Sequence, residues 1–275
     1  MIYSLSDDER TSMKEFFSDL LFENQGAYTL YGTKPVSLSL LSPPLTVKEI
    51  EQFQAYYDSL PEEKKPRMKK KPYDYLSNYQ KWQTIKHRFT IYQYLFGSFP
   101  SPFDPTVEIV FFVNIEESLR VLLRNYEHFH RVLGYDFDPF TVTFEVEDRT
   151  SQFWRDVLHS HALLGILLGF DSADAWFFEW DRKFEESQGK KGDFIRTLPS
   201  TFYDEPDVDC PDPQNFMLPP FRIYGLHPDT ALNVKYELER KFIKKLYQTG
   251  DEVDVALEWL TRPGKKKSCN YVTVH

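Results

Sequence analysis

The chain has 275 residues and a net charge of −9, and aromatic residues make up 17% of it. Burial of these aromatic side chains can offset the conformational entropy that the chain loses on folding, so we expect a folded protein rather than a disordered one. The negative charge disfavours nucleic acid and anionic membranes as partners. The two cysteines, Cys210 and Cys269, are too few for a disulfide framework and are typical of a reducing compartment.

We expect neither a secretory signal nor a membrane-spanning helix in this sequence. The N-terminus, MIYSLSDDER, contains early acidic residues and lacks the apolar stretch of a secretory signal. The longest apolar run, ALLGILLGF at 162–170, has nine residues, whereas a membrane-spanning helix needs about 20. We therefore expect a cytoplasmic protein without a membrane span, and secretion by a signal-independent route stays open.

The first hundred residues predict helices around one strand pair. Residues 6–22 predict a helix capped by Ser6. Residues 28–40 predict two strands joined by a turn that places Lys34 at an exposed tip; its single glycine argues against a phosphate-binding loop. A helix capped by Thr46 and a longer helix from 74 to 97 follow, the second ending at Gly97.

The middle of the chain predicts a strand, a helix and a second strand. TVEIVFFVN is a continuous apolar strand, and its last residue, Asn114, caps a helix over 115–133. Alternation over 142–146 predicts a half-buried strand. This order leaves room for one βαβ unit. Helices are predicted over 151–169, after Asp171, and in the last fifty residues before the tail.

Helices outnumber strands, and the strands fall in separate clusters, which predicts an α+β fold with a small antiparallel or mixed sheet. We expect a single domain over 1–275. Its best internal boundary is the proline-rich stretch at 97–106, and the tail at 263–275 is expected to be flexible.

A possible metal site lies on the helix predicted over 115–133. Glu127 and His130 have the Glu-x-x-His spacing of di-iron carboxylate bundles, and His130 falls in the apolar stripe of this helix. Such bundles need a second pair, but Asp156 and His159 point away from the core face of their own helix. A weaker iron or zinc site formed by Glu127, His130 and His161 stays open beside the simpler interpretation of hydrogen-bonded core histidines.

The segment at 64–71 is strongly basic, although the chain as a whole has a negative net charge. It could contact phosphate or an acidic partner, or it could be a solvated connector whose charge nearby glutamates offset. Its charged residues are Lys64, Lys65, Arg67, Lys69, Lys70 and Lys71.

Small residues at Ala162, Gly165 and Gly169 form a ridge that allows close helix approach. We expect a tight helix crossing in the core, with a symmetric homodimer as the alternative.

Three stretches together resemble a group of uncharacterised proteins from intracellular Gram-negative bacteria. They are LFENQGAYTLYGTKPVS, HALLGILLGF and the end pattern LPPF followed by LNVKYELERKFIKKLYQTGDEVDVALEWL. The resemblance covers most of the chain and implies a bacterial setting. It implies no activity and no catalytic residue.

Three hypotheses about function follow from these observations. The first is an interaction protein that binds a protein partner, either in its own cell or in a host, since no catalytic constellation is evident. The alternative is a metal-dependent enzyme centred on Glu127, His130 and His161. Nucleic-acid binding through the basic segment is a third and weaker hypothesis.

Overall fold

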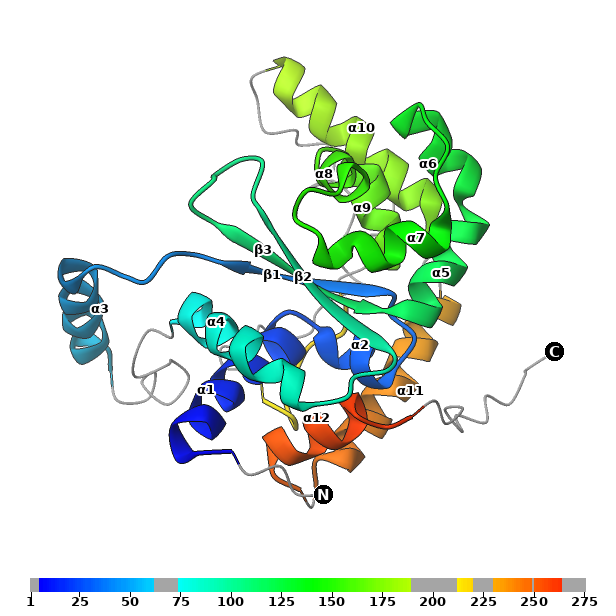
Figure 1. Cartoon of the computed structure of the whole chain (residues 1–275). Coiled ribbons are helices and arrows are strands. Elements are labelled where there is room, and N and C mark those ends of the chain that lie inside the picture. Colours follow the sequence, from blue (N-terminus) through cyan, green and yellow to red (C-terminus); the bar gives the residue numbers. More distant parts are fainter. Residues whose placement is uncertain (1–4, 62–73, 189–211, 220–229, 249, 264–275) are drawn as a thin grey trace.

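The computed structural model describes residues 5–61, 74–188, 212–219, 230–248 and 250–263. In this part of the chain, a three-stranded antiparallel sheet lies between two layers of helices (Figure 1). The strands are β1 (Val36–Leu41), β2 (Tyr94–Pro100) and β3 (Glu108–Asn114), in the order β1-β3-β2. The predicted helix-rich α+β fold is confirmed.

The central strand β3 pairs with both neighbours over its whole length. Val36 of β1 faces Val113, and Tyr94 of β2 faces Asn114. Every described strand pair is antiparallel, so the βαβ unit that the sequence allows is not formed in this part of the chain. The stretch at 97–106 holds the end of β2 and its connection to β3, so it lies within a hairpin.

One face of the sheet is covered by helices from the two ends of the chain (Figure 1). Ser6 caps the first of them in a capping box with Glu9, as the sequence predicts for the cap. The aromatic core of this layer includes Phe16, Trp82 and Phe112. The helical elements are α1 (Asp7–Phe17), η1 (Ser18–Glu23), α2 (Gly26–Tyr31), α4 (Tyr75–Ile85), η3 (Lys86–Arg88), α11 (Thr230–Leu246) and α12 (Glu252–Leu260).

The middle of the chain covers the opposite face and forms a second hydrophobic cluster around Phe111 and Trp154. Its elements are α5 (Ile115–Arg124), α6 (Tyr126–Leu133), α7 (Pro139–Phe144), η4 (Glu145–Glu147), α8 (Gln152–Leu158), α9 (His161–Leu167) and α10 (Ser172–Gln188). A Cβ on Gly165 of α9 would lie only 3.1 Å from Cβ of Ala175 in α10. The predicted tight helix crossing is therefore confirmed at Gly165.

Several local predictions are wrong. The segment 28–30, predicted as a strand, belongs to helix α2, so the turn at Gly32 joins a helix to a strand. The segment 142–146 forms α7 and η4, because Asp138 caps this helix and Pro139 opens it. The helix predicted over 74–97 ends at Ile85, and Gly97 lies in β2. The helix predicted over 151–169 is two helices, α8 and α9.

Helix α3 (Val47–Ser59) stands clear of both layers (Figure 1). Its predicted cap at Thr46 is confirmed and forms a capping box with Glu49. None of the helix's residues is buried. Within the described residues, no helix combines the length and the hydrophobicity needed to cross a membrane.

Candidate functional site

The structure does not bring the three proposed metal ligands together. Glu127 and His130 lie on α6, where His130 Nε2 is 3.3 Å from Asp136 Oδ1. His161, the first residue of α9, packs its ring against the rings of Phe103 and Phe178. Over the described residues, no three His, Cys, Asp or Glu side chains are grouped so that they could hold a metal ion. The hypothesis of a site built from Glu127, His130 and His161 therefore gains no support from the geometry.

The helix predicted over 115–133 is broken, which changes the face on which its histidines lie. Asn125 ends α5 and precedes α6. A helical wheel drawn for one continuous helix over 115–133 therefore does not give the positions of these side chains. Phe129 is the buried residue of α6, and His130 is only partly covered.

The basic segment at 64–71 lies outside the described residues, as do Cys210 and Cys269. Its proposed role in binding stays a prediction.

Lys34 is buried, so its predicted exposure at a turn tip is wrong. Only 4% of the residue is exposed, and its Nζ donates to Ser37 Oγ at 3.0 Å. Ser37 Oγ in turn lies 2.8 Å from Thr29 Oγ1 of α2. Burial lowers the pKa of the Lys34 amine from 10.5 to about 7. The amine is therefore partly uncharged near neutral pH.

The turn that carries Lys34 is held by helix α11. Glu239 Oε1 accepts hydrogen bonds from Thr33 N at 3.0 Å and from Thr33 Oγ1 at 2.8 Å. A Cβ on Gly32 would lie 2.7 Å from the backbone carbonyl oxygen of Tyr28 and 2.0 Å from Glu239 Oε2, so a side chain at this position would force the backbone to shift. A lysine next to a serine hydroxyl is a known acid–base pairing, but Lys34 and Ser37 are both buried. We therefore treat the pair as part of the folded core.

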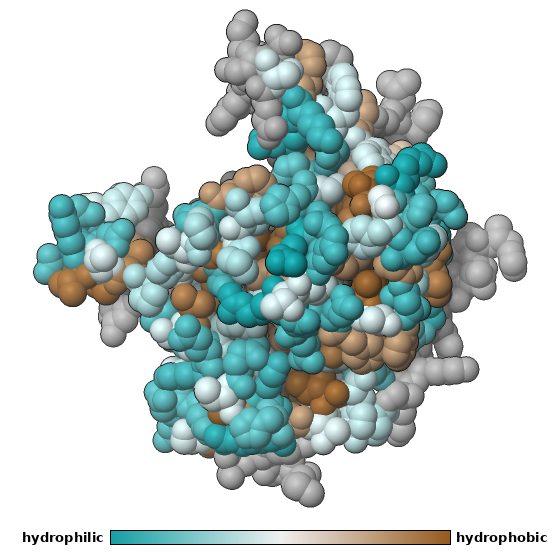
Figure 2. Space-filling view, turned by 45° about the horizontal axis from the view of Figure 1, so that its top comes forward, coloured by the Kyte–Doolittle hydropathy of each residue, from teal (hydrophilic) through white to brown (hydrophobic). Residues whose placement is uncertain are grey.

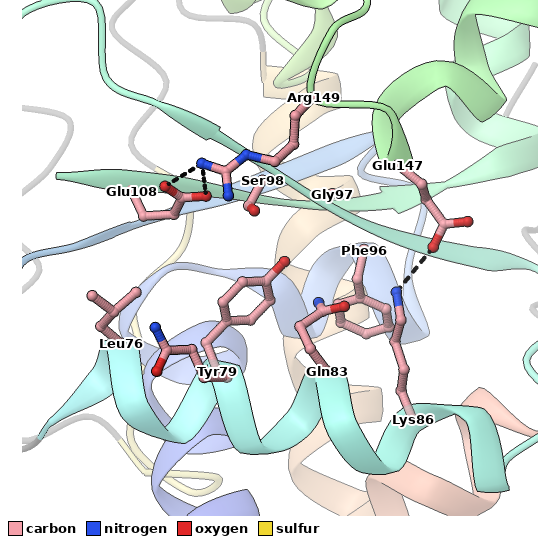
Figure 3. A pocket seen from close by; sticks show the side chains of 11 residues that line it. Leu76, Tyr79, Gln83, Lys86, Phe96, Gly97, Ser98, Glu108, Glu147 and Arg149 are labelled. Atoms are coloured by element: carbon pink, nitrogen blue, oxygen red, sulfur yellow. Dashed lines mark hydrogen bonds and ion pairs between the residues drawn. The ribbon is translucent and has the colours of Figure 1, made fainter. Parts of the chain in front are cut away.

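A cleft of about 440 Å³ opens between α4 and the outer edge of β2 (Figure 3). Leu76, Tyr79 and Gln83 line it from α4, and Phe96 and Ser98 line it from β2. Figure 3 shows the Tyr79 hydroxyl pointing from the helix toward the strand. Burial raises the pKa of Tyr79 to about 12, so this hydroxyl keeps its proton at neutral pH.

Two ion pairs stand at the rim of the cleft (Figure 3). Lys86 Nζ is 3.1 Å from Glu147 Oε1, and Arg149 Nη2 is 2.9 Å from Glu108 Oε1. The first pair links the helix layer that contains α4 to η4 of the opposite layer. These four charges cancel, so the walls of the cleft offer neutral hydrogen-bonding groups rather than a net charge.

Sequence reasoning did not identify the cleft. One signal that could have found it is Gly97, because a glycine inside a strand often marks a close approach of another backbone. A Cβ on Gly97 would lie 1.8 Å from the Val146 carbonyl oxygen, which shows how closely η4 packs on β2. The polar residues of α4 could not be assigned to a cleft from the sequence. They line it only because α4 packs beside β2, a strand more than ten residues further along the chain from the residues that face it.

The exposed helix α3 offers a second surface. Val47, Ile50, Phe53 and Tyr57 recur at helical spacing and form one apolar face. Val47 is 74% exposed and Ile50 is 45% exposed. Figure 2 shows hydrophobic surface gathered on one side of the lobe that this helix forms.

Comparisons with known proteins add no functional information: no family model, no curated protein and no solved structure matches this chain.

Proposed function

We propose that this protein is a protein-binding protein that inserts the apolar face of α3 into a groove of its partner. The observation that carries the proposal is a 13-residue helix with an apolar face and no buried residue. A helix of this length is only marginally stable in water without packing. An amphipathic helix laid in a hydrophobic groove is a common mode of protein recognition, and its anchors have the spacing found here.

The charges of α3 define the chemistry of the partner. Outside the apolar stripe, α3 carries Glu49, Glu51 and Asp58, which border the stripe, against one basic residue, Lys48. The partner should therefore offer an apolar groove with a basic rim. The resemblance noted in the sequence would add a bacterial setting, with the partner in the same cell or in a host, and this setting stays a prediction.

A differential capture experiment tests the proposal. The bait is the full chain, and the disrupting variant is Val47→Glu with Ile50→Glu, which adds two negative charges to the apolar face. Lys48→Glu is the matched control, because it changes the net charge by the same amount on the polar face. Both variants should fold normally, since all three positions are exposed.

We expect at least one protein from a lysate of the source organism to be captured by the wild-type chain and by Lys48→Glu, and to be lost with the double variant. Capture of the same set of proteins by all three baits would refute the proposal. Light scattering on the purified chain distinguishes self-association: a dimer that dissociates in the double variant would make the partner a second copy instead.

A further inference from the structure

Within the described residues, the outer edge of β2 presents backbone groups that have no hydrogen-bond partner. Gln93 O accepts from Ile115 N at 3.0 Å, and Ser101 N donates to Val107 O at 2.8 Å, so odd-numbered residues at both ends of β2 face β3. In an antiparallel strand, alternate residues turn their N–H and C=O to opposite sides. The backbone groups of Phe96 and Ser98 therefore point away from the sheet, and within the described part of the chain they form no hydrogen bond.

The cleft beside this edge has room for a short added strand. A strand rises about 3.3 Å per residue, lies about 4.8 Å from its neighbour and packs about 10 Å from the next layer, which gives roughly 160 Å³ per residue. The cleft volume of about 440 Å³ therefore corresponds to about three residues. Phe96 and Ser98 span the same length of β2.

The helix wall of the cleft holds an unused donor. Gln83 Nε2 is buried and has no hydrogen-bond partner among the described residues. An unsatisfied buried polar atom is unusual in a folded protein and calls for an explanation. The Tyr79 hydroxyl and the Ser98 side chain line the same space (Figure 3). A ligand that supplies an acceptor here would satisfy the Gln83 amide.

We propose that this cleft binds an extended segment of a partner protein, which adds a fourth strand at the edge of β2. One of its side chains points toward α4 and is an uncharged hydrogen-bonding group, from Asn, Gln, Ser or Thr. A charged side chain is disfavoured, because Lys86 and Arg149 already have carboxylate partners in Glu147 and Glu108. This site does not involve α3, so it stands independently of the function proposed above.

The two ion pairs limit the length of the added strand. They lie at the rim of the cleft, where Lys86 meets Glu147 and Arg149 meets Glu108 (Figure 3). Charged groups beside an edge strand oppose extended pairing with another sheet. The site should therefore take a short segment and reject a long flat strand.

Capped pentapeptides are suitable probes. The series is acetyl-Thr-Thr-X-Thr-Thr-amide, with X as Gln, Asn, Ser or Thr, and with Leu, Glu or Lys for comparison. Binding to the full-length chain is followed at millimolar peptide by ligand-observed NMR, and hydrogen exchange of the protein reports protection at residues 94–100. We expect the Gln peptide to bind about tenfold more tightly than the Leu peptide, the effect of one hydrogen bond to a buried group.

Two changes separate edge pairing from adventitious binding. Ser98→Pro removes an outward N–H without breaking a bond to β3, and should abolish binding that Ser98→Ala retains. If Ser98→Pro fails to fold, N-methylation of the peptide tests the same bonds on unaltered protein, and methyl groups at alternate amides should abolish binding. Gln83→Leu should remove the preference for the Gln peptide.

Three results would overturn the proposal. The first is that none of these peptides binds. The second is binding that is unaffected by N-methylation or by Gln83→Leu. The third is slow amide exchange at Phe96 and Ser98 in the free protein, because it would mean that the chain itself already covers this edge.

Discussion

Replacing Lys34 by methionine should change how stability depends on pH. The amine has a pKa of about 7 in the folded protein and 10.5 as its ordinary value. Between these values the unfolded chain binds a proton that the folded chain does not, so the free energy of unfolding rises with pH by about 1.4 kcal/mol per unit. Over the whole interval the wild-type chain gains about 5 kcal/mol, and this gain is absent below pH 7.

Urea unfolding followed by tryptophan fluorescence measures the effect. From pH 7 to pH 9.5, wild-type stability should rise by about 3 kcal/mol more than that of Lys34→Met. The pH range ends at 9.5 because burial raises the pKa of Tyr94 above its ordinary value of 10.0. Above about pH 10 the unfolded chain releases this proton while the folded chain keeps it, so the free energy of unfolding falls with pH.

Lys48→Met is the matched control for the Lys34 variant. Lys48 is an exposed lysine on α3, so its replacement should leave the wild-type pH dependence unchanged. Equal pH dependence in Lys34→Met and in the wild-type chain would refute the assignment of a neutral, buried amine.

Two further substitutions test the packing and the caps. Gly97→Ala should destabilise the protein by about 3 kcal/mol, because the new Cβ would meet the Val146 carbonyl oxygen at 1.8 Å and backbone would have to move. Gly134→Ala, which has open space but a φ of 77°, should cost only about 1 kcal/mol, and equal urea midpoints for the two variants would contradict this ranking. Asp251→Ala should cost about 1–2 kcal/mol, since Asp251 caps α12 at Val253 N and also accepts from Arg10. Asp254→Ala loses only its ion pair with Arg10 and should cost no more than about 1 kcal/mol in thermal unfolding; a larger loss than in Asp251→Ala would contradict the capping role.

Local signals in the sequence predicted the helix starts well. Ser6, Thr46 and Asn114 each cap the helix that they were expected to cap, because a cap depends on residues within one turn. The alternation over 36–40 correctly predicted the strand β1, but not its buried face, because Ser37 and Ser39 are buried and Leu40 is exposed. The alternation over 142–146 was misleading, since the stronger signal was Asp138 followed by Pro139 at a helix start.

The candidate sites could not be predicted in the same way, because they depend on contacts between distant residues. Lys34 looked exposed beside Gly32 and Pro35, but the turn is held by Glu239, about two hundred residues further along the chain. The cleft needs α4 to lie beside the free edge of β2, and the sequence had assigned both to one helix. No pattern within a single segment carries that information.

The division of the core by the sheet has a consequence for how the protein opens. One hydrophobic cluster is built from the two ends of the described chain and the other from its middle, and only three strands lie between them. Each cluster can therefore lose its order while the other keeps its own contacts, as a separate cooperative unit. We expect the amides of α5–α10 to become labile together in native-state hydrogen exchange, at a different denaturant concentration from those of α1, α4 and α12.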